Sequence, residues 1–178
     1  MNYNERDVQN AINNDKIAFE KLYRDINMDL YKMALYMLGD SEIASEVVSD
    51  TVIDALVGIT KLKDVTRFES WILKILTNKC KRKMKEKYNR FSVFNPNAQD
   101  FDDNISQVSS QEREFDTKTD VQIALSKLKQ KDRMIVTLCV VEGYKSHEVA
   151  AIMSMNPSTI RSRLNRSLAK MREYLEVE

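Results

Sequence analysis

The chain has 178 residues, which is enough for one or two small domains. It is 43% hydrophobic and 31% charged, as is ordinary for a globular protein, and no apolar stretch is long enough to span a membrane. Only three glycines and two prolines occur in the whole chain, which favours helix over most of its length. The polar N-terminus has no features of a signal or transit peptide, so we expect a cytoplasmic protein without membrane insertion.

The net charge is only +1, but the charges are segregated along the chain. Acidic residues concentrate in 40–54 and again in 100–120, whereas basic residues concentrate in 74–90 and 161–172. Segregation of this kind indicates two basic surfaces that could meet phosphate and one acidic surface for a different partner.

Two helices are predicted near the N-terminus. The first has apolar residues at helical spacing from Ala18 to Leu38 and ends at Gly39; the second runs from about Ser41 to Val57. The second helix carries Glu42, Glu46, Asp50 and Asp54 four residues apart, which places them in one acidic stripe. Like charges at this spacing repel each other. The sequence does not decide between a solvated face and a docking surface for a basic partner.

A loop over 58–67 leads to a third helix that begins near Phe68. Its second half carries seven cations opposed only by Glu86: Lys79, Lys81, Arg82, Lys83, Lys85, Lys87 and Arg90. This excess is too one-sided for paired surface salt bridges, so we expect the run to face phosphate. Trp71, at helical spacing in the same helix, is more typical of a core residue than of a stacking platform.

Residues 91–117 have no helical period and are rich in acidic and polar residues, so they are predicted to be a flexible acidic linker. Periodic sequence resumes at Val121, and a further helix ends at Gly143. We therefore expect an all-α protein with two small helical domains, 1–90 and 118–178, joined by the linker.

The segment 141–172 is typical of a helix-turn-helix. Gly143 can end the incoming helix, Ser146 can cap the next one, and Asn156 followed by Pro157 is an N-cap with the first residue of a last helix. That helix has an apolar stripe of Ile160, Leu164, Leu168, Met171 and Leu175, and its other faces are strongly basic. This pattern favours DNA binding over an ordinary helical hairpin with a solvated basic face.

Four segments in this order resemble bacterial RNA polymerase sigma factors of the extracytoplasmic-function (ECF) group of the sigma-70 family. They are Ala18–Tyr23, Leu38–Thr51, Phe68–Asn78 and Glu142–Leu164. The resemblance implies a promoter-melting region 2 in residues 1–90 and a region 4 helix-turn-helix in 118–178, joined by the linker.

The resemblance also implies partners and site residues. The acidic helix would dock on the basic coiled coil of the largest subunit of core RNA polymerase, and region 4 on the flap of the second-largest subunit. An anti-sigma factor is expected as an inhibitor. The residues implied for core polymerase binding are Glu42, Glu46, Ser49, Asp50 and Asp54, with Glu46 and Asp50 at the matching positions.

Two further sets are implied for promoter DNA. For the minus-thirty-five element they are Ser158, Thr159, Arg161, Ser162, Arg163, Asn165, Arg166 and Lys170. Of these, Arg161, Ser162, Asn165 and Arg166 are expected to face bases, and Arg163 and Lys170 to hold phosphates. For the minus-ten element they are Lys61, Lys63, Arg67, Asn78, Lys79, Arg82 and Lys83, which would hold the opened strand.

Two other functions compete with this one. A stand-alone DNA-binding regulator would use only the C-terminal domain for DNA and would need no acidic stripe beside a basic helix. An enzyme such as a nuclease has no support, because His147 is the only histidine and forms no metal-ligand set with carboxylates. We therefore expect no catalytic residues, no metal and no cofactor. Cys80 and Cys139 are isolated and are expected to be packed, reduced thiols.

Overall fold

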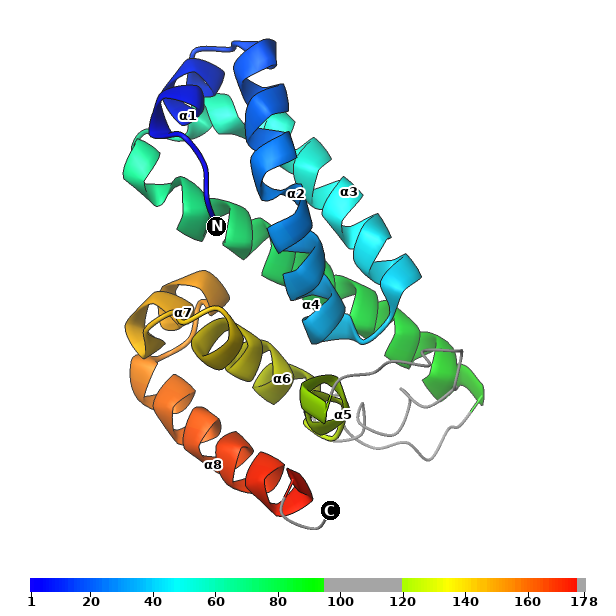
Figure 1. Ribbon diagram of the computed structural model, residues 1–178. Coiled ribbons are helices and arrows are strands. Elements are labelled where there is room, and N and C mark those ends of the chain that lie inside the picture. Colours follow the sequence, from blue (N-terminus) through cyan, green and yellow to red (C-terminus); the bar gives the residue numbers. More distant parts are fainter. Residues whose placement is uncertain (95–119, 176–178) are drawn as a thin grey trace.

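The computed structural model describes residues 1–94 and 120–175, and within them every regular element is a helix or helical turn (Figure 1). The first module consists of α1 (Glu5–Ile12), α2 (Lys16–Leu38), α3 (Ser41–Gly58) and α4 (Phe68–Phe94), with the 3₁₀ turns η1 (Ile59–Lys61) and η2 (Val65–Arg67) before α4. The second consists of α5 (Asp120–Ser126), α6 (Gln130–Val136), the π-helical turn η4 (Thr137–Val141), α7 (Ser146–Met153) and α8 (Pro157–Leu175). The prediction of two small all-α domains is confirmed.

The first module has its helix ends where the sequence predicts them. Gly39 takes the left-handed conformation, with φ of 69°, and its N–H donates to the Leu35 carbonyl at 2.7 Å, which ends α2. The carboxylate of Asp40 then accepts the Ile43 N–H at 3.0 Å and begins α3. The tight turn between these two caps sets α2 and α3 side by side and antiparallel (Figure 1).

The core of the first module forms around α2, which packs against α1, α3 and α4. Leu22, Leu30 and Met33 on α2 are completely buried, as the apolar period predicts. Replacing a leucine of this kind by alanine costs about 2–5 kcal/mol of stability. α1 is helical and buries Val8 and Ala11.

The two modules pack against each other, an arrangement that the sequence did not predict. α7 lies on α4 and α6 lies on α2, so one continuous apolar cluster runs through both modules. Cys80 and Met84 of α4 belong to this cluster together with Ile152 and Met153 of α7. α4 continues to Phe94, four residues into the predicted linker; residues 95–117 of that prediction lie outside the described residues.

Both cysteines are free thiols, as predicted. Cys80 is fully buried, and burial raises the pKa of its thiol to about 12. Cys139 is half-buried, and burial raises the pKa of its thiol as well. No helix in residues 1–94 and 120–175 is long and apolar enough to cross a lipid bilayer.

Candidate nucleic-acid interface

The helix-turn-helix is formed by α7, a short turn and α8. Asn156 begins α8 as predicted: its side-chain oxygen accepts the Ser158 N–H at 2.9 Å and the Ser158 hydroxyl at 2.7 Å, and Pro157 is the first helical residue. α7 ends at Ser154, which adopts a left-handed conformation with φ of 55°. The turn is therefore fixed at both sides by local backbone geometry.

The N-terminus of α7 differs from the prediction. Ser146 was expected to cap this helix, but it is the first helical residue, and the N-cap position belongs to Lys145. A lysine side chain has no acceptor atom, so it cannot bind the free amides of the first turn. Instead, the Glu148 carboxylate reaches back and accepts the Lys145 N–H at 2.6 Å.

The inner face of α8 is narrower than the predicted stripe. Ile160 is completely buried and Leu164 is partly buried, but Leu168 is 38% exposed, so its assignment to the core was wrong. The buried position one residue earlier is Ser167, whose hydroxyl donates to the Arg163 carbonyl at 2.8 Å. Because this small side chain returns its hydrogen bond to its own helix, it can be buried where α8 meets its neighbours, and Leu168 lies outside the buried face.

The residues expected to face bases all lie on the solvent side of α8. Arg161, Ser162, Asn165 and Arg166 are exposed, and so is Lys170. Ser158 is exposed and Thr159 half-exposed at the start of the same helix. The Arg166 Nε donates to the Ser162 carbonyl at 3.3 Å, which leaves the other guanidinium nitrogens without a bond among the described residues. The structure thus brings this set together on one exposed helical face.

Arg163 is the exception in the predicted minus-thirty-five set. Its Nη1 lies 2.8 Å from Oδ1 of Asp132 on α6, and both side chains are largely buried. The ion pair joins α8 to α6 inside the second module. Arg163 is therefore positioned to hold α8 in place, whereas the sequence could not distinguish it from its exposed neighbours.

The predicted minus-ten set divides into two groups. Lys61, Lys63 and Arg67 are exposed around the two 3₁₀ turns, and Asn78 is exposed on α4. Arg67 Nε lies 3.4 Å from Asp64 Oδ2, an exposed pair of little energetic weight. These side chains are available to a ligand from solvent.

The second group, Lys79, Arg82 and Lys83, is ion-paired with the acidic stripe of α3. Lys79 Nζ lies 2.7 Å from Asp54 Oδ2 and 4.0 Å from Asp50 Oδ2. Arg82 Nη2 lies 3.2 Å from Asp50 Oδ2 and is hydrogen-bonded to it. Lys83 Nζ is ion-paired and hydrogen-bonded with Glu46. The expectation that this cationic run is too one-sided for paired salt bridges was wrong, because the compensating acids come from another helix.

The other two residues of the predicted polymerase-binding set, Glu42 and Ser49, lie on the exposed side of α3. The Ser49 hydroxyl donates to the Ser45 carbonyl of its own helix at 3.0 Å. A row of exposed apolar side chains that the sequence did not indicate continues the same helix: Ile53, Leu56 and Val57 are 60%, 48% and 71% exposed.

Trp71 is half-buried at the start of α4 and packs in the core, as predicted. Its ring centroid is 6.1 Å from that of Phe68, and a Cβ added at Gly58 would come within 3.2 Å of the indole ring. The absence of a side chain at Gly58 therefore makes room for the indole against the end of α3.

Three polar contacts between or beside the modules were not predicted. Lys81 Nζ on α4 donates to the Met153 carbonyl at the end of α7 at 3.2 Å. The Tyr144 hydroxyl is hydrogen-bonded to Glu69 of α4, and burial, with this contact second, raises the pKa of the tyrosine. These bonds join residues more than seventy positions apart, which single-sequence periodicity cannot detect.

Arg133 is the third contact and is almost completely buried. Its guanidinium donates to the carbonyls of Leu125 at 2.8 Å, Ser126 at 2.9 Å and Leu128 at 3.4 Å, at the end of α5. Burial lowers the pKa of Arg133 to about 10, so the group remains charged at neutral pH. The negative end of the α5 dipole and these carbonyls take the place of a carboxylate partner.

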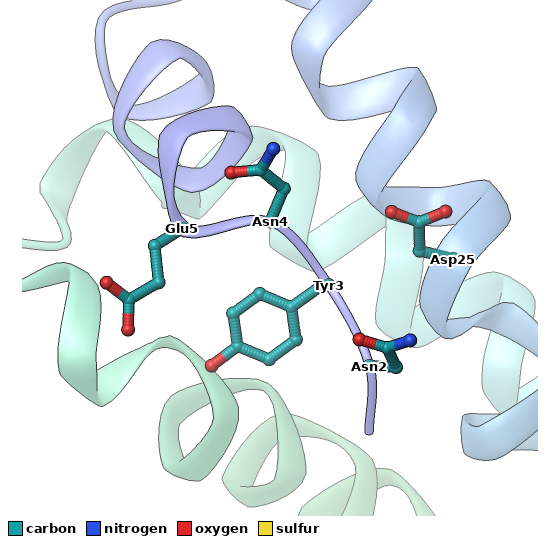
Figure 2. A pocket seen from close by; sticks show the side chains of 5 residues that line it. All are labelled: Asn2, Tyr3, Asn4, Glu5 and Asp25. Atoms are coloured by element: carbon teal, nitrogen blue, oxygen red, sulfur yellow. The ribbon is translucent and has the colours of Figure 1, made fainter.

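The other polar features of residues 1–94 and 120–175 do not bring a second set of predicted site residues together. His147 is exposed, and no cluster of three or more metal-ligating side chains occurs in the two described ranges. Figure 2 shows an open polar hollow beside α1, lined by Asn2, Tyr3, Asn4, Glu5 and Asp25. Tyr3 packs edge-on against Phe68 with ring centroids 5.1 Å apart. None of the predicted site residues lines this hollow.

Comparison with known proteins gives the class first. Residues 22–90 match the model of sigma-70 region 2, and residues 119–171 match that of sigma-70 region 4. The fold is therefore that of two sigma regions in tandem.

Individual relatives then narrow the group. The chain is 26% identical over 169 residues to the ECF RNA polymerase sigma factor SigE of Mycolicibacterium smegmatis; the match covers 89% of this chain but only 62% of SigE. Its fold is similar to that of CnrH, solved in complex with the cytosolic domain of CnrY (TM-score 0.70, 20% identity, 98% and 97% of the two chains covered). It is also similar to that of RpoE from Bartonella quintana, solved with the anti-sigma factor NepR (TM-score 0.66, 19% identity, 90% and 98% covered). The chain belongs to the ECF group of the sigma-70 family.

Proposed function

We propose that this protein binds core RNA polymerase and directs it to promoters by reading a minus-thirty-five and a minus-ten element and assisting strand opening. The observation that carries the proposal is the exposed polar and cationic face of α8, presented by a helix-turn-helix beside a second module of the same family. A second helix of this kind enters the major groove of DNA.

The minus-thirty-five element would be read by four side chains. Arg161 and Arg166 have the length and the paired donors to bind guanine edges, and Ser162 and Asn165 supply smaller contacts between them. Ser158, Thr159 and Lys170 lie at the margins of this face, where they would bind phosphate. Arg163 would contribute by holding α8 on α6 through Asp132.

The minus-ten element would be held by the first module. The exposed cations Lys61, Lys63 and Arg67, together with Asn78, offer a first contact for the opened strand. Lys79, Arg82 and Lys83 extend this surface along α4, provided that their carboxylate partners release them.

Core polymerase would dock on α3 through two adjoining features. Glu42, Glu46, Asp50 and Asp54 form an acidic row with Ser49 beside them, complementary to a basic coiled coil of the largest subunit. The exposed Ile53, Leu56 and Val57 would add apolar contact area. Charges at such an interface set the rate of encounter and the register of the two partners, and burial of the apolar side chains adds affinity. The second module would dock on the flap of the second-largest subunit.

Control by an anti-sigma factor and action in the cytoplasm are part of the same proposal. RpoE of Bartonella quintana, whose fold this chain shares, was solved with such an inhibitor. An inhibitor that covers α3 or α8 would block a surface that the proposal needs.

The test is reconstituted transcription with purified core polymerase and a library of genomic fragments from the source organism. We expect discrete start sites that share upstream and downstream motifs and that are absent when either component is omitted. No start sites from folded protein, with no inhibitor in the preparation, would contradict the proposal. Sequence-specific protection of DNA without core polymerase would instead indicate a stand-alone regulator.

A further inference from the structure

Three lysines from both modules meet where α4 lies against the second module. Lys74 and Lys81 are seven residues apart on α4, so they lie two turns apart on the same side of the helix. The Lys81 Nζ donates to the Met153 carbonyl at the end of α7 at 3.2 Å, which holds this side of α4 against the second module. Lys131, in the first turn of α6, lies close enough for its charge to repel that of Lys81. The junction therefore brings together cations from two helices of different modules.

The positive charge of Lys74 and Lys81 is not compensated within the described parts of the chain. Neither ammonium group has a carboxylate within ion-pair distance there, in contrast to Lys79 and Lys83 on the side of α4 that faces α3. Burial lowers the pKa of Lys81, and repulsion by Lys131 and by Lys74 lowers it further. The one polar atom bound to Lys81 is the neutral Met153 carbonyl. A negative ligand would therefore relieve the repulsion among the three lysines.

The start of α6 also holds an unused hydrogen-bond donor. Gln130, the residue before Lys131, is buried, and its Nε2 donates to no acceptor in residues 1–94 and 120–175. A buried donor without a partner is costly, so this end of α6 has both a charge and a donor that favour an incoming acceptor.

The number and the position of the lysines indicate the chemistry of such a ligand. Lysine binds phosphate as a point charge, and three ammonium groups spread over two helices need a ligand with more than one charged group. Lys81 is half-buried at the end of α7, whereas Lys74 is exposed. A small anion can enter between them, but the convex surface of a DNA duplex cannot reach the half-buried ammonium group.

We propose that Lys74, Lys81 and Lys131 form a binding site at the module junction for a small polyphosphate anion, either inorganic pyrophosphate or the phosphates of a nucleotide. The bound anion neutralises the repulsion between α4 and α6 and holds the two modules together. This site belongs to the free chain and does not depend on the function proposed above.

Linkage gives the size of the effect on the closed arrangement. A ligand that needs lysines from both modules binds the closed chain and not the chain with separated modules. At ten times its dissociation constant, such a ligand raises the ratio of closed to separated chains about elevenfold.

The first experiment measures pyrophosphate binding to the full-length chain by isothermal titration calorimetry at constant ionic strength. Lys74→Gln and Lys131→Gln each remove one ammonium group from the site, and the control Lys21→Gln removes an exposed cation of α2. Loss of one charge-assisted hydrogen bond weakens binding by about tenfold. We therefore expect about tenfold weaker binding in Lys74→Gln and Lys131→Gln and less than a twofold change in Lys21→Gln, with circular dichroism showing that all three are folded. The proposal is wrong if the wild-type chain does not bind pyrophosphate, or if all three variants lose affinity equally.

Two further ligands identify the source of the phosphate. Adenosine diphosphate that binds more tightly than pyrophosphate, and that loses affinity in the same two variants, would identify a nucleotide as the ligand. Equal affinity would identify the phosphate groups alone, and either result supports the site. A single-stranded oligonucleotide that displaces pyrophosphate and depends equally on Lys74 and Lys131 would show a nucleic-acid contact instead, which contradicts the proposal.

The second experiment tests whether the anion joins the modules. Fluorescence energy transfer between dyes on α3 and α8 is recorded while pyrophosphate is added to the wild-type chain and to Lys131→Gln. We expect the transfer efficiency to change toward that of the closed arrangement in the wild-type chain and to stay constant in Lys131→Gln at the same concentrations. The same response in both chains, or none in either, would mean that the anion does not bridge α4 and α6.

Discussion

The two cationic helices, α4 and α8, have similar sequence patterns and different surroundings. Each has an apolar side and a dense run of basic residues. On α4, Lys79, Arg82 and Lys83 are ion-paired with acids of α3. On α8, Arg161 and Lys170 are exposed and have no carboxylate partner among the described residues.

The difference comes from the neighbouring helix. α3 presents Glu46, Asp50 and Asp54 to α4, whereas α7 buries Val149, Ile152 and Met153 and uses its acid, Glu148, to cap its own N-terminus. A basic run in a sequence therefore gives the charge of a helix but not its availability. The described cations of α8 other than Arg163 are exposed to solvent, whereas Lys79, Arg82 and Lys83 of α4 are bound to acids.

The largest effect is expected from reversing the charges of α3, which tests whether its acids bind polymerase. Glu46→Lys combined with Asp50→Lys places cations opposite both α4 and the basic surface of polymerase. Like-charge contacts cost several kcal/mol, so we expect core binding to weaken by at least 30-fold. Competition binding to core polymerase measures it. The control Asp25→Lys changes an exposed acid on α2 and should leave the affinity for core polymerase within twofold of wild type. Unchanged affinity in the double variant would mean that α3 is not a docking surface for polymerase.

A second prediction concerns the buried charge that stabilises the α8 module. Arg133→Met removes a donor from three carbonyls, of which the Leu125 carbonyl keeps the Leu128 N–H, so we expect a loss of about 2–3 kcal/mol in the free energy of unfolding. Urea denaturation followed by circular dichroism measures this loss. Leu168→Ala, at an exposed apolar position of the same module, should cost less than 1 kcal/mol. Equal costs would place Leu168 in the core after all.

Two arginines of α8, one exposed and one ion-paired, are expected to have different roles within the same helix. Arg166→Ala should weaken binding to the preferred upstream element by about 1–3 kcal/mol, relax specificity there and leave core binding intact. Arg163→Ala breaks the ion pair with Asp132 and should lower the melting temperature while keeping sequence preference. Footprinting of the holoenzyme measures sequence preference, and thermal unfolding measures stability. Loss of sequence preference in Arg163→Ala and loss of stability in Arg166→Ala would reverse the two roles.

The contacts that close the two modules onto each other should have a smaller effect. Tyr144→Phe removes the hydrogen bond to Glu69, and Lys81→Gln weakens that to the Met153 carbonyl. A net hydrogen bond is worth about 0.5–1.5 kcal/mol, so each change should raise the population of separated modules about two- to tenfold. Fluorescence energy transfer between dyes on α3 and α8 reports the separation. Tyr23→Phe, at an exposed tyrosine of α2, should leave the transfer efficiency unchanged.

The smallest predicted effect is the pH dependence of Glu142. Burial is the main cause that raises its pKa above the ordinary value of 4.5. A carboxyl with a raised folded-state pKa stabilises the fold below its unfolded pKa, and this contribution is lost as pH rises through the raised value. Glu142→Gln should therefore increase stability by a few tenths of a kcal/mol at pH 7, and the gain should vanish below about pH 4. A gain that is independent of pH would mean that charge is not the cause.

The sequence predicts the local structure well because its signals are local. Gly39, Asn156 and Pro157 determine helix ends through their own backbone and side-chain preferences, and each behaves as predicted. Ser146 fails because capping depends on which residue adopts the extended conformation, and a serine can occupy the first helical position equally well. Leu168 fails because a stripe drawn at spacings of three and four is wider than the surface that α8 buries.

The contacts that the sequence did not predict are made between residues that lie far apart in the chain. The pairing of Glu46 with Lys83 and the contact between Tyr144 and Glu69 follow from how the helices pack. Reading α3 and α4 together as an antiparallel pair could have detected the first, because acids and bases recur along both helices at matching intervals. Nothing in the sequence alone indicates the second. The proposed roles of the exposed α8 residues remain predictions for the experiments above.

Two residues described earlier, Gly39 of the first module and Arg133 of the second, lie close together and limit how sigma modules can be recombined. The Arg133 Nη1 lies 3.4 Å from where a side chain at Gly39 would begin, and Gly39 has a left-handed backbone that other residues resist. A chimera that keeps α2 but imports a foreign second module must therefore fit a surface shaped around this bare glycine. Conversely, a hybrid that places another residue at position 39 would strain the left-handed backbone there and bring its Cβ into contact with the Arg133 guanidinium. Engineers who exchange promoter-reading modules should transplant positions 39 and 133 as a unit.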